Sequence, residues 1–252
     1  MNLLITNDDG IESEGIILLA KALSQKHSVI VIAPSSNMTA SGHSLTIGKS
    51  LFLKKHDIGG GIEAYSLSGT PADCVKFADN NFKDFKIDLV VSGINKGSNL
   101  GSDVVYSGTL SAALEGVCLG YPSIAFSSCA DEDNKFDVCA SAALEMIDGV
   151  LDVTVKGIAW NVNFPNVGRE QIRGIRFTQT GIQLYRDLYE TLSENEYVLR
   201  GQPLEHDRNE EDCDVELIKR NYITVTPILF NKTDYSTLAR FKSKNLEFKT
   251  GK

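Results

Sequence analysis

The chain is poor in the residues that mark several classes of protein. Its five cysteines are an odd number, widely scattered and without a C-x-x-C pair, which argues against a disulfide framework, a structural zinc site and a thioredoxin-like motif. Basic residues are outnumbered 25 to 33, which excludes the broad basic face of a protein that coats nucleic acid. No apolar run approaches the roughly 20 residues that span a bilayer, and residues 1–34 lack a signal-type pattern. We expect reduced thiols, a cytoplasmic location, and no membrane or nucleic-acid polymer as partner.

Two common phosphate-binding motifs are also missing. Neither G-x-G-x-x-G opening a helix after the first strand nor G-x-x-x-x-G-K-[ST] occurs, which disfavours dinucleotide-binding and Walker-type sites. Histidine is scarce, with four in the chain, and none lies near a cysteine in the sequence. A Cys–His nucleophile is therefore not indicated, and only His43 lies in a loop where substrate contact is a minor alternative.

What the chain does contain is an alternation of short apolar runs with longer stretches of helical period, which predicts βαβ units and a parallel sheet. The segments expected to be strands are 3–6, 29–33, 88–92, 123–127 and 158–163, and after about residue 180 the pattern indicates only 222–229. The segments expected to be helices are 15–25, a helix opening at 70–73, 109–119 and 137–151. Thr70 is a candidate cap and Pro71 suits the first helical position. Residues 46–68, around three consecutive glycines, predict a hairpin inserted into this α/β pattern. The α/β class follows from this alternation.

Polar residues follow the predicted strands where a parallel sheet forms its ligand crevice. The first strand ends in Asn7-Asp8-Asp9-Gly10, and Asn95 follows a later strand in a glycine-rich loop. Two adjacent carboxylates repel each other unless a cation holds them, and these oxygen donors favour Mg²⁺, Mn²⁺ or Ca²⁺ over zinc. A solvated turn that caps the next helix is the alternative for this segment.

The segment Ser107-Gly108-Thr109 leads directly into a predicted helix. Backbone N–H groups at a helix N-terminus, together with two hydroxyls, form a cradle for phosphate. A simple Ser or Thr cap is the alternative. The loop at 35–44 is rich in hydroxyls, and plain turn residues explain its composition equally well. Because three loops converge on one sheet edge, the pattern favours a metal-dependent phosphate site.

Five segments then follow one another at family spacing: MNLLITNDDGIESEGI, APSSNMTASGHSLT, SLSGTPADCV, DLVVSGINKGSNLG and VYSGTLSAALEG. On these motifs the sequence closely resembles the SurE (survival protein E) family of metal-dependent nucleotidases, over most of residues 1–180 and again at 222–227. The resemblance implies a Rossmann-like three-layer α/β sandwich with a mostly parallel sheet. It implies a catalytic domain over 1–185 and a C-terminal extension over 186–252, with a hairpin and a tail, that is not an independent domain.

The resemblance also implies an activity and a cofactor. The expected reaction is hydrolysis of nucleoside 5′- and 3′-monophosphates, with short-chain polyphosphate as a further substrate. One divalent ion per subunit is expected, Mg²⁺ or Mn²⁺, with Ca²⁺ as a third option. An aspartyl-phosphate phosphatase of the haloacid dehalogenase type is an alternative, but it needs Asp-x-Asp and this chain has Asn7 at the first position. A nucleotide-sensing module without turnover is the non-enzymatic alternative.

Individual positions take roles from the family. Asp8 and Asp9 match its metal-binding carboxylates and Asn95 its metal-binding amide, and these three are the expected catalytic residues. Thr39 falls on a fourth ligand position that is usually Ser, and Glu14 stands where the family has Pro. The phosphate oxygens are expected on Ser107, Gly108 and Thr109. Water is activated either by the metal or by one of the aspartates acting as a general base.

Charge is distributed unevenly near the C-terminus. Residues 187–216 carry 2 basic and 11 acidic side chains, whereas 217–252 carry 8 basic and 2 acidic ones. Apolar and basic residues alternate over 235–248. Complementary charges favour contacts between subunits, and the family exchanges C-terminal segments, so a homodimer or homotetramer is expected.

Overall fold

The computed structural model describes residues 1–130, 132–152 and 154–242. Its strands are β1 (Asn2–Thr6), β2 (Ser28–Pro34), β3 (Leu53–His56), β4 (Glu63–Leu67), β5 (Leu89–Lys96), β6 (Ser123–Cys129), β7 (Ile158–Pro165), β8 (Ile175–Phe177), β9 (Leu184–Ser193), β10 (Glu196–Leu204) and β11 (Ile223–Leu229). Its α-helices are α1 (Glu14–Leu23), α2 (Pro71–Asn81), α3 (Gly108–Cys118), α4 (Phe136–Glu145), α5 (Asp214–Lys219) and α6 (Tyr235–Lys242). Short 3₁₀ or π segments occur at Gly101–Val105, Met146–Val150 and Arg169–Gln171.

Within these residues, nine strands form one sheet in the order β3-β4-β2-β1-β5-β6-β7-β11-β8. Most neighbouring pairs are parallel, and the exceptions are β3 with β4 and β7 with β11. The predicted α/β fold with a mostly parallel sheet is confirmed. No helix in the described part of the chain has the length and apolar character needed to cross a bilayer.

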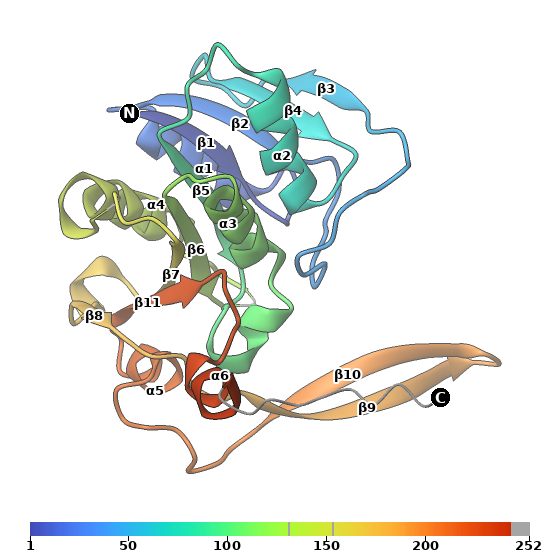
Figure 1. The fold of residues 1–252 in the computed structure, drawn as a ribbon, viewed down its shortest axis with the longest axis vertical. Helices are drawn as coiled ribbons and strands as arrows, with labels where there is room; N and C mark the ends of the chain where they lie inside the picture. Colours follow the sequence, from blue (N-terminus) through green and yellow to red (C-terminus); the bar gives the residue numbers. More distant parts are fainter. Residues whose placement is uncertain (131, 153, 243–252) are drawn as a thin grey trace.

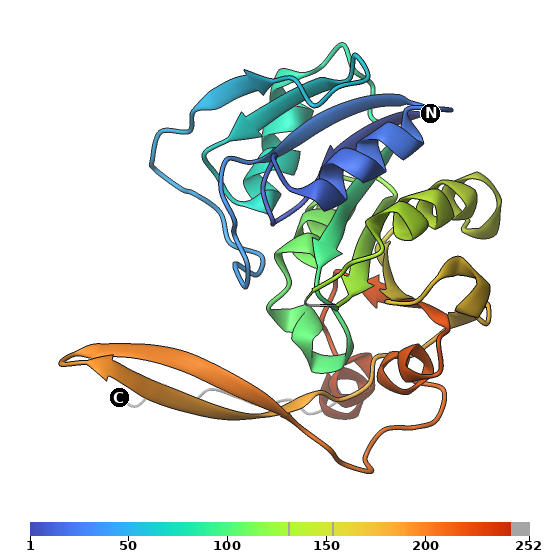
Figure 2. The same cartoon turned by 180° about the vertical axis from the view of Figure 1, so that it is seen from behind.

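Helices cover both faces of the sheet because its central strands are apolar on both sides. In β1, Leu3 and Ile5 belong to the core cluster that contains α1 and α4, whereas Leu4 belongs to the cluster of α2. Successive strand residues point to opposite faces, so this division assigns the two helix pairs to opposite layers. Figure 1 shows α2 and α3 on the near side of the sheet. Figure 2, turned by 180°, shows α1 and α4 on the near side of the opposite face.

The predicted helix cap at Thr70 is confirmed and forms a capping box. The Thr70 hydroxyl accepts from the Asp73 backbone N–H at 3.1 Å, and the Asp73 carboxylate accepts from the Thr70 N–H at 2.9 Å. Pro71 occupies the first helical position, where a missing N–H costs no hydrogen bond.

The hairpin predicted at 46–68 is confirmed, because β3 and β4 pair antiparallel, and β4 also pairs in parallel with β2, so the hairpin extends the main sheet. Two predictions about element bounds were inaccurate. The predicted helix over 137–151 ends as an α-helix at Glu145 and continues as a π segment. Asn95 lies within β5 and not in a loop beyond the strand.

The backbone of β5 is irregular at Gly93, where its register with β6 shifts, but the strand continues because the residues beyond it pair with β6 again. A Cβ at Gly93 would lie 2.4 Å from the Phe126 carbonyl oxygen, and its φ of +131° belongs to glycine. Register with β6 shifts between Ser92 and Asn95, after which Asn95 pairs opposite Ser127.

Beyond residue 180 the sequence pattern indicated only one strand, at 222–229, and β11 confirms it. The same region also contains β9 and β10, which form a separate antiparallel ribbon that projects from the body (Figures 1 and 2). Most side chains of this hairpin are exposed, so it lacks the one-sided apolar alternation that identifies a strand in a sequence. The predicted contact segment 235–248 lies within the described residues only as far as Lys242.

Candidate functional site

The turn after β1 is held by the side chain of Asn7. The Asn7 amide donates to the Gly10 carbonyl at 3.0 Å and to the Ser13 hydroxyl at 2.8 Å, and its oxygen accepts from the Gly10 N–H at 3.2 Å. Asn7 is fully buried. These bonds fix the direction in which the next two residues, Asp8 and Asp9, leave the sheet edge.

Asp8 is a buried carboxylate that faces the start of α3. Its side chain accepts a hydrogen bond from the Thr109 hydroxyl, and the residue is 4% exposed. Burial, reinforced by the neighbouring Asp9 charge, raises the pKa of Asp8 to about 6 despite the Thr109 bond. The environment therefore disfavours the charge unless a cation offsets it.

Asp9 and Asn95 lie at the same edge of the sheet, Asp9 just beyond β1 and Asn95 as the penultimate residue of the neighbouring β5. Asp9 accepts from the Lys96 backbone N–H at 3.0 Å, and burial raises its pKa although the Lys96 contact opposes the shift. The Asn95 amide nitrogen donates to the Gly97 carbonyl at 2.9 Å. With its nitrogen so engaged, Asn95 has its side-chain oxygen available for a cation.

The loop at 35–46 is bonded to the site at two points. The Met38 N–H donates to the Asp8 carbonyl at 2.7 Å, and the Gly42 N–H donates to the Tyr106 carbonyl at 3.1 Å. Thr39 follows Met38 and is exposed, and its hydroxyl donates to the Asn37 side chain at 2.6 Å. A hydroxyl that donates in one direction keeps its lone pairs free to act as a ligand.

Ser41 is a candidate that sequence reasoning did not single out. Its hydroxyl oxygen is buried and has no hydrogen-bond partner among the described residues. A Cβ built at Gly108 would lie 2.8 Å from that oxygen and 2.8 Å from the Asp8 Cβ, so Ser41, Asp8 and the start of α3 meet at one point. The hydroxyl-rich loop was a signal, but only the folded chain distinguishes Ser41 from its neighbours.

The residues at the start of α3, Ser107, Gly108 and Thr109, differ in the hydrogen bonds that they form. Ser107 caps the helix, with its oxygen accepting from the Leu110 N–H at 3.0 Å, so the capping alternative describes its observed bond. Its hydroxyl proton is still free to be donated. The Thr109 hydroxyl is bonded to Asp8, so the groups of this turn that could bind an anion are the first backbone N–H groups of α3.

Beside Asp9 lies an open cavity of about 570 Å³. Its lining combines polar, charged and aromatic side chains: Asp9, Ser13, Glu14, Lys96, Glu132, Asp133, Asn134 and Phe136, with Gly15. The cavity therefore opens onto Asp9 and is large enough for a small organic molecule.

The donor set fits a hard divalent cation. Two carboxylates, one amide oxygen and one or two hydroxyls are the ligands that Mg²⁺ and Mn²⁺ prefer. The raised pKa of Asp8 and the unpartnered hydroxyl of Ser41 mark polar groups whose burial a cation would relieve. His43, by contrast, points to Glu115 on α3, with 2.8 Å between its Nε2 and the carboxylate.

Comparisons with known proteins agree on one family. The family model described as "Survival protein SurE" matches residues 3–187. Similar proteins include the 5′-nucleotidase SurE of Kosmotoga olearia, 42% identical over 250 residues, covering 97% of this chain and 98% of that protein. The 5′-nucleotidase SurE of Thermosipho africanus is 41% identical over 252 residues, covering 97% of each. The crystal structure of the SurE protein from Aquifex aeolicus matches with a TM-score of 0.79 and 34% identity, over 95% of this chain and 98% of that one.

Proposed function

Because this chain belongs to the SurE family, we infer that it is a metal-dependent 5′-nucleotidase, a phosphatase of nucleoside monophosphates. One structural observation supports this most directly. The buried Asp8 carboxylate, next to Asp9, faces the N-terminal turn of an 11-residue helix through Thr109. A cation site and an anion-binding helix terminus therefore meet at one sheet edge, which is what a phosphate monoester requires.

We propose one divalent ion per subunit, Mg²⁺ or Mn²⁺, held by Asp8, Asp9, Asn95 and Thr39. When bound, such an ion neutralises charge on the phosphate oxygens and lowers the pKa of a coordinated water. Ser41, whose hydroxyl lies beside Asp8 at the start of α3, is a further hydroxyl of this loop, and we add it to the candidate ligands of the metal or the phosphate.

Protein groups bind the phosphate oxygens, orient Asp8 and accept the proton of the attacking water. The α3 backbone N–H groups of Gly108 and Thr109, with the Ser107 hydroxyl proton, hold phosphate oxygens. Thr109 keeps Asp8 oriented. Asp9 borders the open cavity, so of the two carboxylates it is the one placed to accept a proton from the attacking water.

We propose that the nucleoside occupies the cavity beside Asp9. Phe136 offers an apolar surface there, and Glu14 and Asn134 offer acceptors for hydroxyl or amino groups. Glu14 stands where the family has Pro, so it is the residue through which substrate preference in this chain would differ. Nucleoside 3′-monophosphates and short polyphosphates belong in the same substrate test.

Phosphate release tests the assignment. The purified chain is incubated with a panel of 5′- and 3′-monophosphates and tripolyphosphate, with Mg²⁺ or Mn²⁺. We expect release from at least one nucleoside monophosphate, abolished by chelation and in Asp9→Asn. No release across the panel would favour a nucleotide sensor, and a trapped acyl phosphate on Asp8 would favour the aspartyl-phosphate mechanism. Asn7 argues against the latter, because its amide is used to hold the turn.

We further propose that the chain forms a homodimer or homotetramer through its C-terminal part. The β9–β10 hairpin exposes Tyr189 (73%), Tyr197 (61%) and Leu199 (52%), which the strand register places on one face. A two-stranded hairpin is marginally stable in water by itself, and clustered exposed apolar side chains mark an interaction surface. A second copy of the chain is the occupant that we propose. The division at residue 185 and the cytoplasmic location remain predictions.

A further inference from the structure

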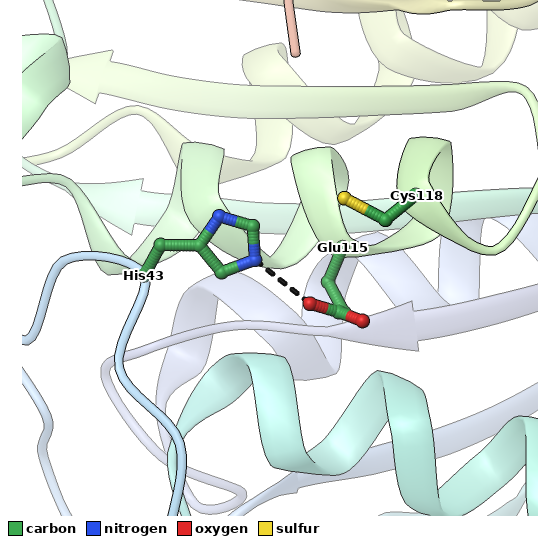
Figure 3. Close-up of side chains that lie close together, drawn as sticks. All are labelled: His43, Glu115 and Cys118. Atoms are coloured by element: carbon green, nitrogen blue, oxygen red, sulfur yellow. Dashed lines mark hydrogen bonds and ion pairs between the residues drawn. The ribbon is translucent and has the colours of Figure 1, made fainter. Parts of the chain in front are cut away.

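A second group of potential metal ligands lies farther along α3, away from the proposed catalytic site. Glu115 and Cys118 are three residues apart on this helix, which places them on one face. His43 approaches that face from the loop at 35–46, and its Nε2 lies 2.8 Å from the Glu115 carboxylate (Figure 3). Glu115 follows Thr109 by six residues, or about 9 Å of helix rise.

We propose that His43, Glu115 and Cys118 form a second metal site, which binds a zinc-class ion. One ligand atom of each residue lies within 4.8 Å of the other two. Imidazole nitrogen, thiolate sulfur and carboxylate oxygen are the donors of protein zinc sites, and three protein ligands leave a fourth position for water. The oxygen-only set around Asp8 selects harder ions, so the two sites differ in the metal that they prefer.

The residues around the cluster are compatible with an ion. Lys76 forms an ion pair with Oε1 of Glu115, while His43 contacts Oε2. Lys76 therefore orients the carboxylate from its far oxygen, as hydrogen-bonding groups behind metal ligands commonly do, and leaves Oε2 for the ion. Glu115 is buried, whereas the His43 side chain is 29% exposed, which gives the ion a route from solvent.

Binding exchanges one set of contacts for another. The ion replaces the direct bond between His43 and Glu115, takes a neutral imidazole nitrogen, and displaces the thiol proton of Cys118 to solvent. Burial and the nearby Glu115 charge raise the pKa of this thiol, so it is protonated before the ion arrives. The bound ion would link the loop that carries Thr39 and Ser41 to the side of α3.

Cobalt absorption tests this proposal on the full chain. The protein is kept in excess Mg²⁺, so that oxygen-donor sites are filled, and is titrated with Co²⁺, which occupies zinc sites and absorbs in the near ultraviolet when bound to thiolate. We expect a charge-transfer band that saturates at one cobalt per chain and is displaced by Zn²⁺. Cys118→Ser should abolish the band, and His43→Gln should weaken binding about tenfold or more.

Two matched variants control the assignment. Cys129→Ser changes the other cysteine that is not fully buried, and Asp9→Asn changes the proposed catalytic site. Both should retain the band. Absence of a band in the wild-type chain, a band that persists in Cys118→Ser, or its loss in Asp9→Asn would each overturn the proposal. AMP hydrolysis with Mg²⁺ is measured separately, so a failure of the proposed function is not confused with a failure here.

Discussion

Replacing Asp8 by Asn should make the metal-free protein more stable while removing its activity. Burial raises the pKa of Asp8 from 3.8 to about 6, which means that the folded chain disfavours the charged carboxylate. At 1.36 kcal/mol per pKa unit, the ionised group destabilises the fold by about 3 kcal/mol above pH 6. The amide of Asn carries no charge, and its oxygen can still accept the Thr109 hydroxyl.

The sign of this stability change, and its dependence on pH, follow from proton linkage. Between its unfolded pKa of 3.8 and its folded pKa of about 6, Asp8 holds its proton more tightly in the folded chain. The destabilisation is therefore complete above pH 6, declines as the pH falls, and vanishes below pH 3.8. We expect Asp8→Asn to raise the free energy of unfolding by about 3 kcal/mol at pH 8 and by about 1 kcal/mol at pH 4.5.

The assay is urea unfolding of chelator-treated protein at both pH values, with phosphate release measured in parallel. A gain of about 3 kcal/mol corresponds to roughly 6–12 °C in Tm for a chain of this size. Asp84→Asn, at an exposed position, is the control and should change neither measurement. Mg²⁺ should stabilise the wild type and not Asp8→Asn. If Asp8→Asn is no more stable than the wild type at pH 8, burial of the ionised Asp8 carboxylate does not destabilise the fold as argued.

Three further predictions test other parts of the site and the surface. Gly108→Ala places a Cβ 2.8 Å from the Asp8 Cβ, so it should destabilise the fold by about 1–3 kcal/mol and lower kcat about 100-fold. Gly149→Ala, in open space, is its control in the same thermal melts and phosphate-release assays. Equal stability and equal kcat in the two variants would refute the packing argument. Thr39→Ser should preserve metal affinity, whereas Thr39→Ala should raise the Kd for Mn²⁺ roughly 10- to 100-fold by calorimetry; unchanged binding in the alanine variant would exclude direct ligation. Tyr189→Asp should shift the mass measured by light scattering toward the monomer while Tyr189→Phe does not, and a monomeric wild type would contradict the proposed assembly.

The convergence of Asp8, Asp9 and the start of α3 was predictable from the sequence. Carboxyl ends of parallel strands meet at one edge, and the helix that follows β5 starts at the same edge. This geometry explains why Thr109 contacts Asp8 across 101 residues of chain. The strands and helices there were likewise predictable, because their apolar periodicity reflects burial on both sheet faces.

Other features depend on tertiary contacts that periodicity does not encode. The unpartnered hydroxyl of Ser41 and the approach of His43 to Cys118 appear only when the loop at 35–46 folds onto α3. Asn95 was misplaced because the irregular step at Gly93 resembles the end of a strand in sequence. The β9–β10 hairpin was not recognised by pattern because nearly all of its side chains face water in the single chain.

The position of β11 affects how the chain is made as well as how it is held together. β11 inserts between β7 and β8, although residues 178–222 separate it from β8. During synthesis β7 therefore presents an unpaired, apolar edge until residue 229 has emerged, and β8 has no sheet to join. Open edges of this kind template aggregation, so the nascent chain is most vulnerable while residues 166–229 are being made. Pulse-labelled chains truncated before β11 should accordingly be recovered in the insoluble fraction.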